Sequence, residues 1–388
     1  MKNTFLKPLL FLAIALVSAA CENKEADQIQ NVEFNRPYIV AQENAEEIAQ
    51  ELLGYTKATK HKLTISTTTV KDADQQPYFH IVNTSSTSSQ NFVIISGDKR
   101  TAPVLGYGQE HVTIQDTPEA FHYWLNQFKT QIDEVRANQL EDLESLSNFK
   151  TRALQKSFTK KDSEHTPLLT TNWNQGCVYN SYSPSYGSSI DLNCNRNLPC
   201  DKAYTGCVST CLSQMINFYQ SMDNVNYELL KDSYTLADLD TPEGNEVGQL
   251  MRRVGDIMDM NYQCGGSGSP ANYLLLQDYI TQELGFTSNI YRKYYNRNGR
   301  YTLISELQSG NPIVFSGIDD NSNGGHFWIA DGVKLTEDYE YYLHFNWGWG
   351  GNRDGWFLLG DFDSGNYNFS RSTQFYYNFR KETTETNW

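Results

Sequence analysis

A cysteine at the expected start of a helix is the first residue that could carry chemistry. After a turn at Gly206, apolar residues recur at helical spacing, namely Val208, Cys211, Leu212, Met215, Ile216 and Tyr219. Cys207 therefore falls in the first helical turn, where the helix dipole and unpaired backbone N–H groups lower the pKa of a thiol. The resulting thiolate would be a nucleophile. The alternative is that Cys207 is half of a disulfide or a small buried side chain.

A cysteine nucleophile needs an imidazole that accepts its proton and returns it, and the imidazole usually comes from another part of the chain. Two histidines lie in suitable surroundings. His326 follows two glycines and opens the apolar segment 327–330, which predicts a strand start where the ring can face a cleft. His344 lies inside a predicted strand over 341–345 among aromatic residues, which favours a place in the core or on the sheet surface. His326 is therefore the candidate base.

A third segment of unusual composition follows the second of these strands. Asn346-Trp347-Gly348-Trp349-Gly350-Gly351 interleaves two tryptophans with three glycines. Indole faces could enclose a histidine and exclude water, and Asn346 could orient the imidazole ring through its amide. A packed turn with aromatic corners is the alternative interpretation.

The elements that must position these residues belong to a chain of 388 residues, which is long enough for two domains. Apolar residues make up 39% and aromatic residues 13% of the chain, whereas charged residues make up only 20%. This composition predicts a globular protein with a substantial core. The net charge of −15, without a visible basic patch, argues against nucleic acid as a partner.

The N-terminus has the pattern of an export signal. Two lysines precede an apolar segment, 8–20, that is too short to span a membrane, so residues 1–20 are predicted to be a removable signal peptide. Small residues at its end fit an ordinary signal peptidase. Cys21 after two alanines instead fits bacterial lipid attachment, although Ser18 stands where that motif usually has leucine. We favour a lipoprotein anchored to the cell envelope through Cys21, with residues 21–30 as a polar tether, over simple secretion.

The following part of the chain mixes helix and strand signals. Apolar spacing predicts helices over 45–53 and 120–140, and short apolar segments predict strands over 92–95 and 104–107. Residues 141–166 then become rich in Glu and Ser, and later in Lys, with no apolar periodicity. We interpret this stretch as a linker, and exposed polar linkers are preferred sites of proteolysis.

The remaining cysteines all lie beyond residue 176: Cys177, Cys194, Cys200, Cys207, Cys211 and Cys264. Export permits disulfides, and if one cysteine is a nucleophile, at least one of the other five must also be unpaired. No two cysteines have zinc-type spacing, and a calcium-like segment, 319–324, has Ala330 where such a loop needs a glutamate. We therefore expect neither a metal nor a cofactor.

Several of these segments together resemble one family. The segment 206–210, with Gln214 and Met215, resembles the nucleophile motif of the streptopain family of bacterial cysteine peptidases. Further similarity covers the histidine motif of that family (325–332), its NWGWGG signature (346–351), the start of its mature enzyme (167–169 and 173–175) and its inhibitory propeptide (91–100 and 104–107).

The resemblance implies a papain-like α+β fold, in which the nucleophile helix packs on a twisted antiparallel sheet behind a smaller α+β prodomain. It implies an inhibitory prodomain over 31–150, an activation linker over 151–166 and a cysteine peptidase domain over 167–388. The expected protein is a cysteine endopeptidase made as a zymogen, with protein or peptide substrates and its own prodomain as intramolecular inhibitor.

The resemblance also implies roles for individual residues. Cys207 would attack the scissile carbonyl, His326 would act as base and then as acid, and Gln175 would help to hold the oxyanion. Trp347 and Asn346 fall where the family positions the histidine. Trp349 would line the cleft, and Ser269 and Gly325 fall near positions that contact the substrate backbone.

The chain departs from streptopain in its extra cysteines. They crowd the expected catalytic domain and suggest that the insertion 181–202 is a disulfide-pinned loop near the site. Two alternatives to an endopeptidase stay open, namely a surface protein that binds peptides without turnover and a cell-wall amidohydrolase with a Cys/His pair. A binding protein would have no need for Cys207, His326 and Gln175 together.

Overall fold

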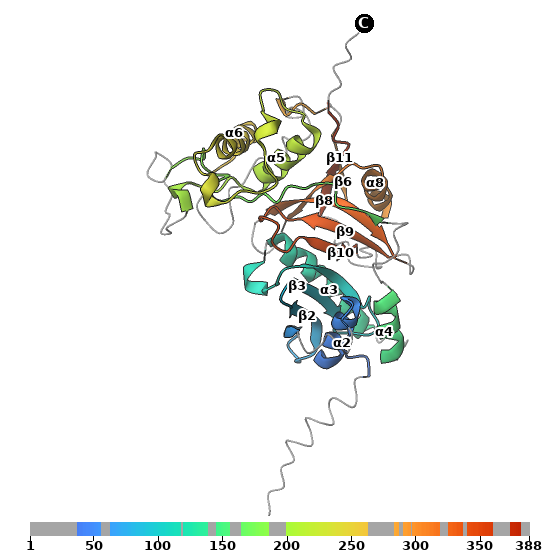
Figure 1. Ribbon diagram of the computed structural model, residues 1–388. Helices are drawn as coiled ribbons and strands as arrows, with labels where there is room; N and C mark the ends of the chain where they lie inside the picture. The colour runs from blue at the N-terminus through green and yellow to red at the C-terminus, as the bar shows by residue number, and fades with distance from the viewer. Residues whose placement is uncertain are drawn as a thin grey trace, which may run out of the picture. The chain divides into compact units, whose positions relative to one another are not determined.

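The computed structural model describes twelve stretches of the chain (Figure 1): residues 37–55, 63–117, 119–138, 145–155, 164–185, 199–262, 283–286, 290–295, 297–318, 325–336, 340–359 and 373–381. The predicted signal peptide and tether with Cys21, and also Ser269, Cys194 and Cys264, lie outside these residues. Within the described stretches, none of the helices combines the length and apolar character needed to cross a membrane.

The elements before the linker are α2 (Gln42–Leu52), β1 (Thr64–Lys71), β2 (Pro77–Ser85), β3 (Gln90–Ser96), β4 (Val104–Gln109), η2 (Ile114–Asp116), α3 (Glu119–Ala137) and α4 (Leu146–Gln155). Those after it are β5 (Glu164–His165), η4 (Pro199–Asp201), α5 (Cys207–Tyr219), η5 (Tyr227–Leu229), η6 (Leu236–Asp238), α6 (Pro242–Ile257), β6 (Tyr291–Tyr294), α8 (Arg297–Gln308), β7 (Ile313–Ile318), β8 (Gly325–Leu335), β9 (Tyr341–Asn346), β10 (Gly355–Leu358) and β11 (Gln374–Tyr377). The predicted helices at 45–53 and 120–140 and the predicted strands at 92–95 and 104–107 are confirmed.

The prediction that residues 141–166 form an irregular linker is wrong in part. Residues 146–155, inside the stretch interpreted as linker, form α4. Its Phe149 and Ala153 are four residues apart, so they share one face of the helix. Both are buried in a cluster with Ile48 of α2 and with strands β2 and β3. Two apolar residues at this spacing are enough to dock a short helix, but they are too few to reveal it in an otherwise polar sequence.

The strands form one antiparallel sheet in the order β1-β2-β3-β4-β10-β9-β8-β7-β11-β6. The short strand β5 lies outside this order and pairs with β8. The sheet therefore continues from the N-terminal part into the C-terminal part through the pair β4 and β10. At this junction Gly355 lies opposite Gly108. A Cβ atom on Gly355 would lie 2.5 Å from the carbonyl oxygen of Tyr107, so the close approach of the strands requires glycine.

The two faces of the C-terminal sheet are covered by different helices, as the alternation of side chains along a strand demands. Val314, Phe327 and Ile329 face a core that they share with α5 and α6, and these two helices lie side by side. Phe315 and Trp328 face a second core that contains residues of α8 and of α3. The expected arrangement, a nucleophile helix packed on an antiparallel sheet, is confirmed.

Candidate active site

Helix α5 begins at Cys207, as the apolar spacing predicts. The preceding Gly206 has φ of 86°, a backbone conformation that glycine adopts without strain, and its carbonyl accepts the backbone N–H of Thr210 at 3.1 Å. Cys207 is half-buried and present as a thiol, whereas residues 208–216 behind it are all buried. The thiol therefore sits at the end of a helix that the core holds firmly.

A hydrogen bond ties the first turns of α5 to the strand that carries the histidine. The Cys211 thiol donates to the carbonyl of Phe327 over 3.3 Å, and burial raises the pKa of Cys211 well above its usual range. Cys211 is thus a neutral core residue, as expected. Because it lies one turn beyond Cys207 and Phe327 follows His326, the bond brings the N-terminal part of α5 against the start of β8.

The His326 ring is buried and has one hydrogen-bond partner among the described residues. Its Nε2 lies 3.2 Å from the backbone carbonyl of Trp347. A carbonyl accepts but does not donate, so Nε2 carries the proton and, in a neutral ring, Nδ1 is left as a proton acceptor. Burial lowers the pKa of His326 to about 4, which keeps the ring neutral near pH 7.

The carbonyl that orients His326 is itself held rigidly. The indole of Trp347 is fully buried and donates its Nε1–H to the carbonyl of Arg353 at 3.0 Å. Its backbone N–H donates to the Asp354 carboxylate at 2.9 Å. Trp347 therefore contacts the His326 ring through its backbone carbonyl.

Asn346 does not orient the imidazole, which corrects the expectation from sequence. Its Nδ2 donates to the Thr171 carbonyl at 2.8 Å and to Gln214 Oε1 at 3.1 Å. Its Oδ1 accepts the backbone N–H of Gly348 at 3.0 Å and Gln214 Nε2 at 3.3 Å. These four bonds use both donors and both acceptor sites of the amide, so no capacity is left for His326.

The backbone of Gln175 is hydrogen-bonded to the segment that leads into Cys207. Its carbonyl accepts the N–H of Thr205 at 3.1 Å, and the neighbouring Asn174 side chain caps Gly176 N–H at 2.8 Å. The Gln175 side chain is half-buried, and its amide has no hydrogen-bond partner within the described part of the chain.

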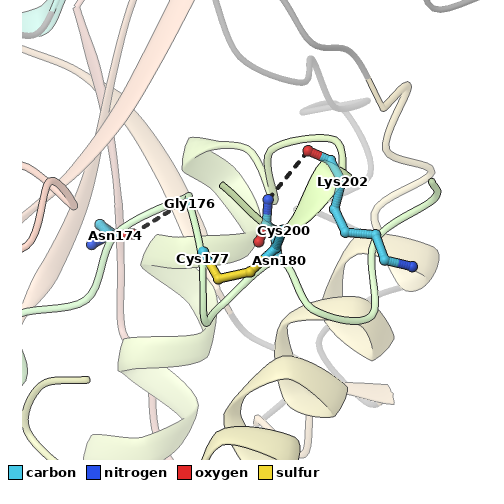
Figure 2. Close-up of a disulfide and its surroundings, with 6 residues drawn as sticks. All are labelled: Asn174, Gly176, Cys177, Asn180, Cys200 and Lys202. Carbon is cyan, nitrogen blue, oxygen red and sulfur yellow. Dashed lines mark hydrogen bonds between the residues drawn. A yellow bond between two sulfur atoms is a disulfide. The ribbon is translucent and has the colours of Figure 1, made fainter. Parts of the chain in front are cut away.

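A disulfide joins Cys177 to Cys200 and closes a loop with a sequence separation of 23 residues (Figure 2). The sequence left the pairing of the six cysteines beyond residue 176 open, and this disulfide establishes the pairing of two of them. Beside it, Asn180 Nδ2 donates to the Lys202 carbonyl at 3.3 Å. The insertion is thus pinned two residues from Gln175, as expected.

Of the three residues expected to contact substrate, the structure describes two. Gly325 is the exposed first residue of β8, and Trp349 is half-buried against the aromatic core that includes Trp347. Ser269 lies outside the described residues.

Sequence reasoning assigned no role to several polar residues of this region. The His344 imidazole forms an ion pair with the buried Asp331 at 2.7 Å, and the other Asp331 oxygen accepts the Leu169 N–H at 3.0 Å. Gln214 contacts Asn346 as described above. Two signals in the sequence pointed to Gln214. It belongs to the segment that resembles the nucleophile motif, and it lies seven residues after Cys207 and therefore on the same helical face.

Elements of the N-terminal part contact the loop that orients His326. The Phe121 ring of α3 packs edge-on against the Trp347 indole with centroids 5.9 Å apart. Trp124 donates its Nε1–H to the Leu358 carbonyl at 3.3 Å, and Tyr342 donates its hydroxyl to the Val104 carbonyl at 2.6 Å. The N-terminal part is therefore integrated with the sheet beside the candidate site.

Comparison with known families decides the class of protein. The peptidase C10 family profile matches residues 173–357, and the Spi protease inhibitor profile matches residues 37–132. The chain carries a C10 peptidase domain preceded by a Spi-type inhibitor domain. It is therefore a cysteine endopeptidase, and the resemblance drawn from the sequence motifs is confirmed.

Individual relatives agree with this assignment. Streptopain of Streptococcus pyogenes is 25% identical over 309 residues, which cover 70% of this chain and 72% of that protein. The thiol protease/hemagglutinin PrtT of Porphyromonas gingivalis is 22% identical over 304 residues, 69% of this chain but 32% of the relative. A prointerpain A fragment of Prevotella intermedia, 20% identical, superposes with a TM-score of 0.56 over 81% of this chain and 98% of the fragment. The papain-like α+β fold is thereby confirmed.

Proposed function

We propose that this C10 peptidase is exported as an inactive precursor and hydrolyses peptide bonds with Cys207 and His326. The observation that carries the proposal is the state of His326: its Nε2–H is fixed by the Trp347 carbonyl, so Nδ1 is the nitrogen that can take a proton. The hydrogen bond between Cys211 and Phe327 brings the helix of the thiol to the strand of this ring.

The chemistry then follows from these groups. His326 Nδ1 accepts the thiol proton, and the Cys207 sulfur attacks the scissile carbonyl to form a tetrahedral intermediate. The oxyanion accepts hydrogen bonds from the Gln175 amide and the Cys207 backbone N–H. His326 returns the proton to the leaving amine, and a water molecule, activated in the same way, hydrolyses the thioester.

The substrate contacts are assigned by the resemblance and by position in the fold. Gly325 precedes the base on an exposed strand end, and Trp349 lies two residues beyond the carbonyl that orients it. We assign the substrate backbone to Gly325 and Ser269, and the wall of the cleft to Trp349.

The precursor state is supported by the contacts of α3. We assign residues 31–150 to the inhibitory prodomain, 151–166 to the activation linker and 167–388 to the peptidase. Phe121 presses on Trp347, and His326 stays neutral because burial lowers its pKa to about 4. A pKa of about 4 disfavours transfer of the Cys207 proton to His326 and therefore disfavours the thiolate–imidazolium pair in the precursor. We propose that cleavage in the linker permits the pair to form. A Cys207→Ala chain that still matures without added protease would exclude self-cleavage.

Export and lipid attachment rest on the sequence of residues 1–30 alone. We propose removal of residues 1–20 and lipidation of Cys21 in the bacterial cell envelope. Incorporation of a labelled fatty acid into the wild-type chain, and its loss in Cys21→Ser, tests this assignment. Release of the wild-type protein into the medium without label would favour plain secretion.

Hydrolysis of casein by the full chain after cleavage in the linker tests the enzymatic proposal. Activity should vanish in Cys207→Ala and fall about 10²–10³-fold in Gln175→Ala, because one oxyanion donor is lost. Purified cell wall serves as the competing substrate. Release of amines from cell wall with no hydrolysis of casein would identify an amidohydrolase, and tight peptide binding without hydrolysis would identify a binding protein.

A further inference from the structure

Three buried polar side chains from three separate segments meet behind the candidate active site. Gln214 lies on α5, Asn346 ends β9, and Thr171 belongs to the segment between the linker and Gln175. None of the three exposes more than 3% of its surface. We refer to Thr171, Gln214 and Asn346 as the amide cluster.

The hydrogen bonds inside the amide cluster fix the orientation of both amides. Gln214 and Asn346 pair reciprocally, with Nε2 to Oδ1 at 3.3 Å and Nδ2 to Oε1 at 3.1 Å. Gln214 Oε1 also accepts the Thr171 hydroxyl at 2.8 Å, and Asn346 Nδ2 also donates to the Thr171 carbonyl at 2.8 Å. Rotating either amide by 180° would place oxygen against oxygen, so the cluster admits one arrangement.

Each member of the cluster is tied to one catalytic group. Gln214 is seven residues beyond Cys207, almost two full turns, and therefore shares its face of α5. Asn346 precedes Trp347, whose carbonyl orients His326, and also accepts the next backbone N–H, that of Gly348. Thr171 lies four residues before Gln175 on a segment whose Trp173 carbonyl accepts the N–H of Gly350.

We propose that the amide cluster is the positioning device that sets the thiol, the imidazole and the oxyanion donor relative to one another. This inference rests on the proposed function, because it assigns the roles of Cys207, His326 and Gln175 as given there. The cluster contacts none of the reacting atoms, so its members are positioning residues. A displacement of about 1 Å among catalytic groups can lower a rate about 100-fold.

Replacing Gln214 by methionine is the first test, because methionine has a similar length and no amide. The full chain, cleaved in the linker, is assayed on a peptide substrate, and Cys207 is alkylated with iodoacetamide. A positioning role predicts a fall in kcat of about 100-fold, little change in KM and slower alkylation of Cys207. A variant that is folded, with kcat and alkylation within twofold of wild type, would overturn the proposal.

Replacing Gln214 by glutamate should change the pH dependence of kcat, which a merely structural role would leave unaltered. A protonated carboxyl has the shape of the amide: its hydroxyl can donate to Asn346 Oδ1, and its carbonyl can accept from Thr171 and Asn346. The ionised carboxylate loses that donor and faces the Asn346 oxygen. Since burial raises the pKa of a carboxyl, kcat relative to wild type should be near normal at low pH and fall as pH rises.

Two further variants control these measurements. Gln374→Glu places a carboxyl at another buried glutamine, on β11 outside the cluster, and should add no such step to the profile of kcat. If Gln214→Met does not fold, Thr171→Val removes the hydroxyl at nearly constant shape, and Thr171→Ser should restore the rate. A flat ratio to wild type in Gln214→Glu, or equal rates in the two Thr171 variants, would also overturn the proposal. Inactivity of the cleaved wild-type chain itself would instead refute the proposed function.

Discussion

The two histidines of the C-terminal sheet show how neighbours decide the state of one side chain. Burial lowers the pKa of both, but His326 faces only a neutral carbonyl and ends with a pKa of about 4. His344 faces the Asp331 carboxylate at 2.7 Å, which overcomes burial and raises its pKa. Near pH 7 the first ring is thus neutral and able to accept a proton. The Asp331 carboxylate instead favours the charged form of His344, and their contact ties β9 to β8.

Asp354 gives a prediction at the same scale. Burial raises the pKa of this carboxyl to about 7, despite the hydrogen bond from Trp347 N–H and the nearby His344. A raised pKa means that the contribution to stability is complete below about pH 4 and is lost as pH rises towards 7. Asp354→Asn keeps the acceptor for Trp347 and removes this loss. Three pKa units correspond to about 4 kcal/mol, and partial exposure reduces the expected gain at pH 8 to roughly 2 kcal/mol.

Urea unfolding of the wild-type chain and of Asp354→Asn at pH 4 and pH 8 measures this effect. The variant should gain stability over the wild type only at the higher pH. An equal difference at both values would mean that the carboxyl is not titrating between them.

At the scale of elements, α3 connects the inhibitory part of the chain to the loop of the base. Phe121 contacts Trp347 at 5.9 Å between centroids, and Trp124 contacts Phe357 of β10 at 4.9 Å. The same helix therefore holds both the strand that continues the sheet and the residue whose carbonyl orients His326. Loss of α3 would remove the packing around that carbonyl.

Truncating Phe121 to alanine should weaken the packing of α3 around the Trp347 carbonyl. The substitution is expected to lower the free energy of unfolding by about 3–5 kcal/mol and to raise the rate at which Cys207 is alkylated in the uncleaved chain. Phe149→Ala is the matched control, because Phe149 is equally buried but packs with α2 and not with the loop. Equal acceleration of alkylation in both variants would show that general loosening, rather than the contact with Trp347, is responsible.

At the scale of the whole molecule, some structural features could be predicted from local sequence and others could not. The start of α5 at Cys207 follows from apolar spacing, and β8 starts at Gly325, one residue before the predicted start at His326. Both could be predicted because each depends on its own segment. The continuation of the sheet from β4 to β10, the Cys177–Cys200 pairing and the contacts of Gln214 depend on residues far apart in sequence. The apolar periodicity of a single segment cannot predict contacts between residues far apart in the chain. The expected role of Asn346 was wrong for the same reason, since distant partners occupy its amide.

The disulfide yields a prediction for the stability of the whole chain. A loop of 23 residues closed by Cys177 and Cys200 should stabilise the fold by about 3 kcal/mol, mainly by restricting the unfolded chain. Guanidinium unfolding is best compared in a Cys207→Ala background, where the catalytic thiol cannot exchange. Adding Cys177→Ser and Cys200→Ser should lower the free energy of unfolding by that amount. An unchanged value would mean that the bond constrains little beyond its own loop.

The central claim, that His326 activates Cys207, is tested most directly by the alkylation rate at low pH. A thiol with a pKa near 8.5 is only about 0.3% ionised at pH 6 and reacts slowly, whereas a thiolate paired with an imidazolium reacts fast. The full chain, cleaved in the linker, is treated briefly with iodoacetamide at pH 6 and mapped by peptide. We predict rapid labelling confined to Cys207, and its loss in His326→Ala. Labelling of Cys207 at the rate of an ordinary thiol, or at the same rate in both proteins, would contradict the account.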